Sequence, residues 1–255
     1  IPSGRSLNEY TLKILKDWVS QGGTLIAHNS SSRYLASDKG IGSVKQLQNT
    51  FANSKEYNFD LMREIYALSN DINKEITNEN NVNFEINYPW EEIEGFLSEN
   101  ELKDRDKWQS IFMPSGSFVA GRIDNEHWLT FGTTETIPVL YSNYPILMTR
   151  SNSDAPVRIG NMIPNNEIDI PRVVNWSSIP AGFDLNVRMS GLVWPEASQR
   201  IANSAYLTRE RVGNGQVILF SGEPNFRGAT LGTNRLWLNA IVYGPGLGTR
   251  SKIDL

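Results

Sequence analysis

The sequence contains no cysteine and only two histidines among its 255 residues. The absence of cysteine excludes disulfide bonds, thiolate catalysis and thiolate-bound zinc. No apolar run reaches the roughly 18 residues of a membrane span, so none is expected. A net charge of −4 argues against a nucleic-acid partner, which would require a basic surface. What remains is enough apolar sequence, 39%, to bury the core of one large α/β domain.

The stretch GGTLIAHNSSSRYLA, residues 22–36, has the pattern of a buried strand, a tight turn and the start of a helix. Helical spacing of apolar residues over 7–19 predicts a preceding helix, with Ser6 and Glu9 at the spacing of a capping box. Residues 24–27 are too apolar to alternate, which favours a strand buried on both faces of a parallel sheet. A nucleophile elbow places its reactive side chain on such a turn. Ser30 is therefore a candidate nucleophile.

The remainder of the chain is predicted to form one domain, residues 1–255, with a mainly helical insertion at residues 37–108 that would act as a lid or docking surface. Within it, short helices are expected near residues 44–51, 59–68 and 89–97. Extended segments are expected at 116–123, 139–141, 146–149, 157–159 and 172–175. Residues 205–212 and 216–220 form a predicted hairpin around Gly213-Asn214-Gly215, between helices at 195–202 and 233–243.

The first residues, Ile1-Pro2-Ser3-Gly4, resemble the end of a strand entering a loop. They contain neither an initiator methionine nor the basic and apolar regions of a signal peptide. We therefore expect a fragment, with an N-terminally truncated sheet and further sequence upstream.

Two of these landmarks resemble class I glutamine-amidotransferase-like domains. Ser30 takes the position of the cysteine nucleophile in that family's elbow, and Ser32 the position of the following glycine. Residues 213–224 resemble the family's late hairpin and strand, after which a His-Pro-Glu supplies the catalytic base. Here Glu223-Pro224-Asn225 stands in its place. The resemblance implies a three-layer, flavodoxin-like α/β fold from which the nucleophile and the base have both been lost.

A narrower resemblance is to the C-terminal domain of large bacterial zinc carboxypeptidases, through residues 124–132, 189–192, 213–220, 224–228 and 234–241. It implies a secreted or periplasmic, non-catalytic accessory domain without a cofactor of its own. Its partner would be an upstream metallopeptidase domain or a processed partner chain. Neither histidine, His28 or His127, begins a His-x-x-Glu ligand pair, so no metal site is expected here.

Two other functions stay open on the sequence. One is a hydrolase that uses Ser30, with Glu223 as a weak substitute for the histidine base. The other is a peptide- or carbohydrate-binding module in the cleft between the two turns. Its candidate ligand-binding residues are His28, Ser30, Arg33, Glu223, Asn225 and Arg227.

Two arginines in such a cleft could hold the carboxylate of a peptide C-terminus or a sugar acid. The structural alternative is an ion pair of Arg33 or Arg227 with Glu223 that only joins the loops. Among the seven tryptophans, Trp18 and Trp237 are predicted to lie in the core.

Overall fold

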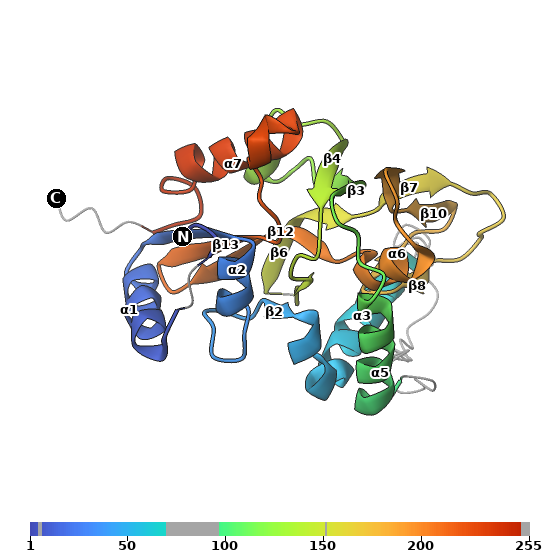
Figure 1. Ribbon diagram of the computed structural model, residues 1–255, viewed down its shortest axis with the longest axis horizontal. Helices are drawn as coiled ribbons and strands as arrows, with labels where there is room; N and C mark the ends of the chain where they lie inside the picture. Colours follow the sequence, from blue (N-terminus) through green and yellow to red (C-terminus); the bar gives the residue numbers. More distant parts are fainter. Residues whose placement is uncertain (5–6, 70–96, 151, 251–255) are drawn as a thin grey trace, which may run out of the picture.

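The computed structural model describes residues 1–4, 7–69, 97–150 and 152–250. Its centre is a mixed sheet in the order β1-β13-β12-β6-β3-β11, with β4 beside β3, β5 beside β12 and β2 beside β5 (Figure 1). Among the described strands of this sheet, β1 and β13 form the parallel pair and the other pairings are antiparallel.

The strands of the main sheet are β1 (Thr24–His28), β2 (Lys45–Gln46), β3 (Ser117–Ile123), β4 (Thr136–Tyr141), β5 (Leu147–Met148), β6 (Ser153–Ile159), β11 (Arg188–Ser190), β12 (Ala205–Val212) and β13 (Gly215–Phe220). Two small antiparallel pairs lie outside it: β7 (Asn161–Pro164) with β10 (Phe183–Asn186), and β8 (Arg172–Val174) with β9 (Ser177–Ile179).

The helices are α1 (Glu9–Ser20), α2 (Ser30–Leu35), α3 (Ser54–Ser69), α5 (Glu99–Ser110), α6 (Pro195–Ile201) and α7 (Leu231–Tyr243). Short 3₁₀ turns are η1 (Leu47–Asn49), η2 (Phe51–Asn53), η3 (Trp128–Thr130) and η4 (Phe226–Gly228). No helix in the described part of the chain has the length and apolar character needed to cross a membrane.

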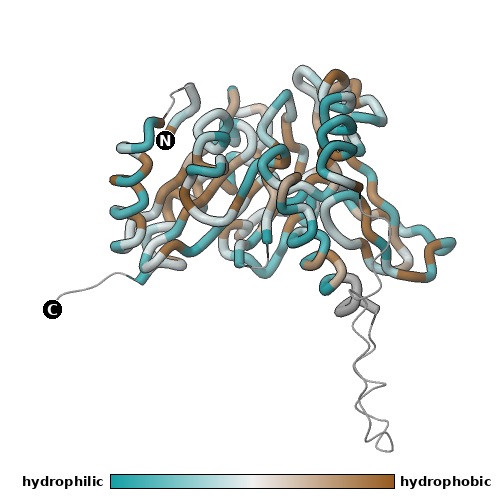
Figure 2. The backbone as a smooth tube through the Cα atoms, turned by 90° about the horizontal axis from the view of Figure 1, so that it is seen from below, coloured by the Kyte–Doolittle hydropathy of each residue, from teal (hydrophilic) through white to brown (hydrophobic). Residues whose placement is uncertain are grey.

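Strand β13 shows why the fold has three layers, because its successive side chains enter two different cores. Ile218 and Phe220 pack in the larger cluster, which includes residues of α7. Val217 and Leu219 pack in a second cluster with residues of α1 and α2. Alternate side chains of a strand point to opposite faces of a sheet. Helices on both sides therefore enclose the sheet, with α7 on one side and α1 and α2 on the other (Figure 1). Figure 2 shows hydrophobic stretches in the central segments of the backbone.

Several sequence predictions are confirmed. The α/β architecture with helices on both faces is observed, as are strands near 116–123, 205–212 and 216–220 and helices near 195–202 and 233–243. The flavodoxin-like detail is not confirmed, and the mostly antiparallel ladder differs from the parallel sheet that residues 24–27 suggested. In β1 only Leu25 and Ala27 are buried.

The region predicted to be a helical insertion contains α3 and α5, but also β2, which joins the main sheet. The expected helix near 44–51 is replaced by β2 and two 3₁₀ turns. The expected helix at 89–97 lies almost wholly outside the described residues. Helix α5 was missed, although Ser98 and Glu101 form a capping box at its start.

The first helix is capped differently from the prediction. Ser6 lies outside the described residues, and the Asn8 side chain accepts from the backbone N–H of Thr11. The expected apolar stripe is also only partly buried. Val19 is fully buried, but Trp18 is 49% exposed and is not a core residue. Trp237 is partly buried against the larger core, in agreement with its prediction.

Candidate functional site at the strand–helix elbow

The turn between β1 and α2 has the backbone of an elbow, but its strained residue is Asn29. Asn29 has φ 50° and ψ −121°, a combination that only glycine adopts freely. Ser30 is the next residue and already begins α2. The family resemblance predicted the nucleophile position at Ser30. The strained backbone lies one residue earlier, at Asn29, whose side chain has no nucleophilic group.

Ser30 participates in hydrogen bonds to the N-terminal segment. Its Oγ lies 3.0 Å from Ser3 Oγ and accepts a hydrogen bond of 2.7 Å from the Gly4 backbone N–H. A serine nucleophile needs a base within hydrogen-bond reach. The polar contacts of Ser30 Oγ are with a hydroxyl and a backbone amide, so they supply no imidazole.

The two following serines fasten the turn to its surroundings. Ser31 Oγ donates to the Pro2 carbonyl at 2.6 Å, and Ser32 Oγ donates to the Phe220 carbonyl at 2.7 Å. Both serines are fully buried. A buried hydroxyl needs such a partner, so this serine run is explained by hydrogen bonding within the fold.

Glu223 lies beside the elbow because β1 and β13 are parallel neighbours. His28 is in register with Phe220, so the turns that follow the two strands lie at the same edge of the sheet, as predicted. The Asn29 amide Nδ2 donates to Glu223 Oε1 at 3.1 Å. An amide–carboxylate hydrogen bond therefore joins the two turns.

His28 is the imidazole nearest to this pair in sequence, and its surroundings favour its neutral form. Burial lowers its pKa below the ordinary value, and the nearby charge of Glu223 opposes that shift. Its ring lies edge-on to Trp237, with 5.5 Å between the ring centroids. Its Nδ1 is buried without a hydrogen-bond partner. Tyr144 also lies near Glu223, and its pKa is raised by burial and then by that carboxylate.

The other predicted ligand-binding residues are not gathered into this site. Arg33, Asn225 and Arg227 are exposed. Arg227 places its guanidinium 5.2 Å from the centroid of the Phe226 ring. Among the described residues, neither arginine forms an ion pair with Glu223, so the expected pairing with Arg33 or Arg227 is not observed.

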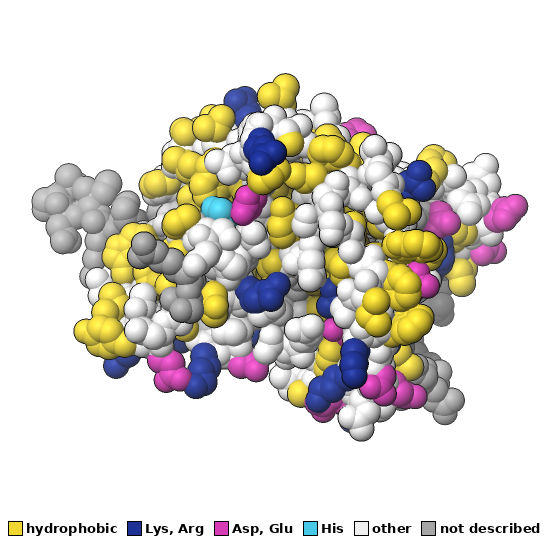
Figure 3. Space-filling view, in the orientation of Figure 1, with side chains coloured by type: hydrophobic (Ala, Val, Ile, Leu, Met, Phe, Trp, Pro, Cys, Tyr) yellow, Lys and Arg dark blue, Asp and Glu magenta, His cyan; other side chains and the backbone are white. Residues whose placement is uncertain are grey.

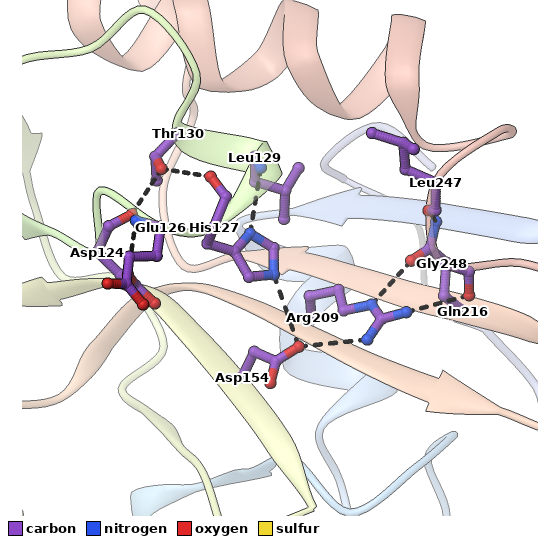
Figure 4. Close-up of polar contacts among 10 residues, drawn as sticks. All are labelled: Asp124, Glu126, His127, Leu129, Thr130, Asp154, Arg209, Gln216, Leu247 and Gly248. Atoms are coloured by element: carbon purple, nitrogen blue, oxygen red, sulfur yellow. Dashed lines mark hydrogen bonds and ion pairs between the residues drawn. The ribbon is translucent and has the colours of Figure 1, made fainter.

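His127 belongs to a separate polar cluster shown in Figure 4. Its Nδ1 accepts from the Leu129 backbone N–H at 3.1 Å, and its Nε2 lies 3.6 Å from Asp154 Oδ2. Arg209 Nη1 donates to the same carboxylate oxygen at 3.3 Å. His127, followed by Arg209, lowers the pKa of Asp154, while partial burial opposes the shift.

Both ring nitrogens of His127 are therefore engaged. Arg209 extends the cluster by donating to Gln216 Oε1 at 2.9 Å and to the Gly248 carbonyl at 3.0 Å (Figure 4). Gln216 Nε2 in turn donates to the Leu247 carbonyl at 2.8 Å. The cluster thus joins the segment after α7 to strands β6, β12 and β13.

Comparisons with known proteins add no assignment to this site. No family model, curated protein or solved structure matches the chain. Within the described ranges, no group of three or more histidine, aspartate or glutamate side chains could hold a metal ion.

Proposed function

We propose that this chain is a non-catalytic accessory domain with an amidotransferase-like fold, similar to the C-terminal domain of zinc carboxypeptidases. The supporting observation is the hydrogen bond between Asn29 and Glu223 at the elbow. In our proposal, these two residues stand where amidotransferase-like enzymes have a nucleophile and a base. An amide is not activated by a carboxylate for acyl transfer, whereas the backbone turn that would present a nucleophile is retained.

The outer surface of α7 supports a role in packing against another domain. Leu231, Leu238 and Val242 are 85%, 52% and 64% exposed, and they lie on one helix together with exposed Ile241 and Tyr243. Figure 3 shows apolar side chains gathered over this edge of the molecule. Contiguous exposed apolar surface is typical of an interaction site.

A second apolar surface, on α1, adjoins the end of α7. Tyr10 and Ile14 are exposed with Trp18, and Trp18 lines a shallow depression together with Pro245. In our proposal, the exposed side of α7 supports a metallopeptidase domain, and α1 presents a second apolar surface on the other side of the sheet. That partner domain would carry the zinc ligands and the peptidase chemistry.

The absence of catalysis is tested directly on the purified chain. We expect no glutaminase, esterase or carboxypeptidase turnover above buffer, and no difference between the natural protein and Ser30→Ala. Turnover that is lost in Ser30→Ala and also in Glu223→Gln would refute the proposal and support the Ser30 hydrolase.

The partner is tested by reading the coding sequence that surrounds this chain and by binding. We expect a neighbouring metallopeptidase domain with two histidines and a glutamate as zinc ligands. When that domain is expressed separately, it should bind this chain, and Leu238→Lys should weaken binding at least about tenfold. Asp104→Lys, at an exposed position of α5, is the control and should bind normally. An unrelated neighbouring sequence, or equal binding by both variants, would contradict the accessory role.

A further inference from the structure

Two arginines on adjacent strands face each other across the centre of the sheet. Arg122 of β3 is in register with Arg158 of β6. Both side chains are partly buried. Like charges that lie directly opposite in an antiparallel pair repel each other. Such a pair therefore lowers the stability of the fold unless a negatively charged group lies next to it.

The partners that these guanidinium groups have are neutral. Arg122 donates to the Gly160 carbonyl and to Asn203 Oδ1, both at 3.0 Å. Arg158 donates to the Asn203 carbonyl at 3.0 Å and to Thr149 Oγ1 at 3.3 Å. Within the described ranges, neither arginine has a carboxylate within the 4.0 Å of an ion pair. A guanidinium carries five N–H donors, so each retains unused donors.

Glu64 of α3 is the acidic residue that influences both arginines. Its carboxylate is directed to β9 instead, accepting from Ser177 Oγ at 3.2 Å and from the Ser178 backbone N–H at 3.1 Å. Glu64 is exposed, so water screens its charge. The buried Ser178 Oγ nearby has no hydrogen-bond partner. Glu64 therefore compensates the arginine pair only weakly.

Two cavities, one of about 370 Å³ and one of about 380 Å³, share Arg158 and Glu64 in their linings. The second cavity also contains Arg122 and Ser178, with apolar side chains of Ile123, Met162 and Pro180. Burial, followed by the charge of Arg158, lowers the pKa of Arg122 to about 10. Burial and the neighbouring Arg158 both disfavour the charged form of Arg122, and a bound anion would offset both effects.

We propose that Arg122 and Arg158 bind the carboxylate group of a small organic acid, with Ser178 Oγ as a further donor and the apolar side chains around its carbon skeleton. Two planar guanidinium groups suit a carboxylate because each can donate two parallel hydrogen bonds. Glu64 and Asp124 line the same cavity, so a singly charged carboxylate meets less repulsion than a doubly charged phosphate. The sequence predicted Arg33 and Arg227 as the two arginines that could hold a carboxylate, whereas our proposal assigns this role to Arg122 and Arg158.

Isothermal titration calorimetry on the full chain tests this site with four probes. N-acetylalanine represents a peptide C-terminus and butyrate an aliphatic acid, while N-acetylalanine amide is the neutral match and inorganic phosphate the competing anion. We expect saturable binding of at least one carboxylate with a Kd on the order of 1 mM and none of the amide. No carboxylate binding, or binding of phosphate alone, would overturn the assignment.

Variants then locate the binding. Arg158→Gln and Arg122→Gln should each weaken carboxylate binding at least about tenfold, because a charge-assisted pair of hydrogen bonds is lost. Arg188→Gln is the matched control, since Arg188 lies exposed on β11, which also pairs with β3. Affinity unchanged in both Arg122→Gln and Arg158→Gln would refute the site.

Glu64→Gln gives a test that does not require removing a buried arginine. It should raise carboxylate affinity about threefold, because one competing negative charge disappears. If the arginine variants fail to fold, this variant decides: unchanged or weaker binding in Glu64→Gln refutes the proposal. The outcome is independent of the accessory role, which concerns the α1 and α7 surfaces.

Discussion

The strained backbone of Asn29 predicts an inverted preference between glycine and alanine at this position. In most structured positions, alanine is more stable than glycine, because glycine loses more conformational freedom on folding. Asn29 has φ 50° and ψ −121°, where a Cβ is unfavourable. Asn29→Gly should therefore be more stable than Asn29→Ala.

The magnitude follows from comparing these two variants with each other. Both lose the hydrogen bond to Glu223, so that loss cancels in the difference. Alanine keeps the backbone strain, which costs about 1–3 kcal/mol for a non-glycine residue. Glycine relieves it but adds about 0.4–1 kcal/mol of unfolded-state entropy. The free energy of unfolding should favour Asn29→Gly over Asn29→Ala by about 1–2 kcal/mol.

Urea unfolding followed by tryptophan fluorescence measures this difference. Asp104 is the control position, because it is exposed in the interior of helix α5. At this position the free energy of unfolding of Asp104→Ala should exceed that of Asp104→Gly by about 1 kcal/mol, because alanine has the higher helix propensity. If alanine is as stable as glycine at position 29, Asn29 does not hold the elbow conformation and the assignment of the elbow to this residue is wrong.

Three further predictions concern the core, the elbow histidine and the hairpin. Arg200 and Asp106 form a buried ion pair of 2.8 Å. Urea unfolding should show that Arg200→Met lowers the free energy of unfolding by about 3–5 kcal/mol, because it leaves the Asp106 carboxylate buried without a partner. Adding Asp106→Leu should restore part of that loss. Burial lowers the pKa of His28, so the folded state favours the neutral imidazole. The contribution of His28 to stability is therefore complete when the pH lies above the ordinary pKa of 6.5, and it is lost as the pH falls toward the lowered pKa. The Tm should therefore fall as the pH is lowered from about 7 to about 5, and this dependence of Tm on pH should be weaker in His28→Gln. An equal dependence in the variant would contradict the role of His28. A Cβ at Gly215 would collide with the backbone carbonyl of Val19, so Gly215→Ala should lower the free energy of unfolding by about 1–3 kcal/mol in the same urea assay, and a neutral effect would argue against this packing.

Helices, strands and turns could be predicted from the sequence wherever the residue pattern that specifies them lies within the segment itself. Apolar spacing and a glycine–asparagine turn identify the hairpin of β12 and β13, and the serine-rich turn marks the elbow. Helix α5 was missed because it is highly charged and has little apolar periodicity. The exposure of Trp18 was missed because helical spacing predicts a stripe but not what covers it.

The candidate site was predicted only in part for a related reason. That the turns after β1 and β13 meet was expected from the fold that the family resemblance implies, and the parallel register of the two strands confirms it. Which residue of the turn is strained depends on where the strand ends and the helix begins. A shift of one residue moves the elbow position from Ser30 to Asn29, and with it the chemistry of the site.

The sequence by itself therefore determined the α/β class and most of the strands and helices. Only the tertiary structure decided which side chains meet there and elsewhere. Arg122 and Arg158 are far apart in the chain and share no motif, yet the register of β3 and β6 sets them opposite each other. Strand register is fixed by long-range packing, because a slip of one residue would turn every side chain to the other face.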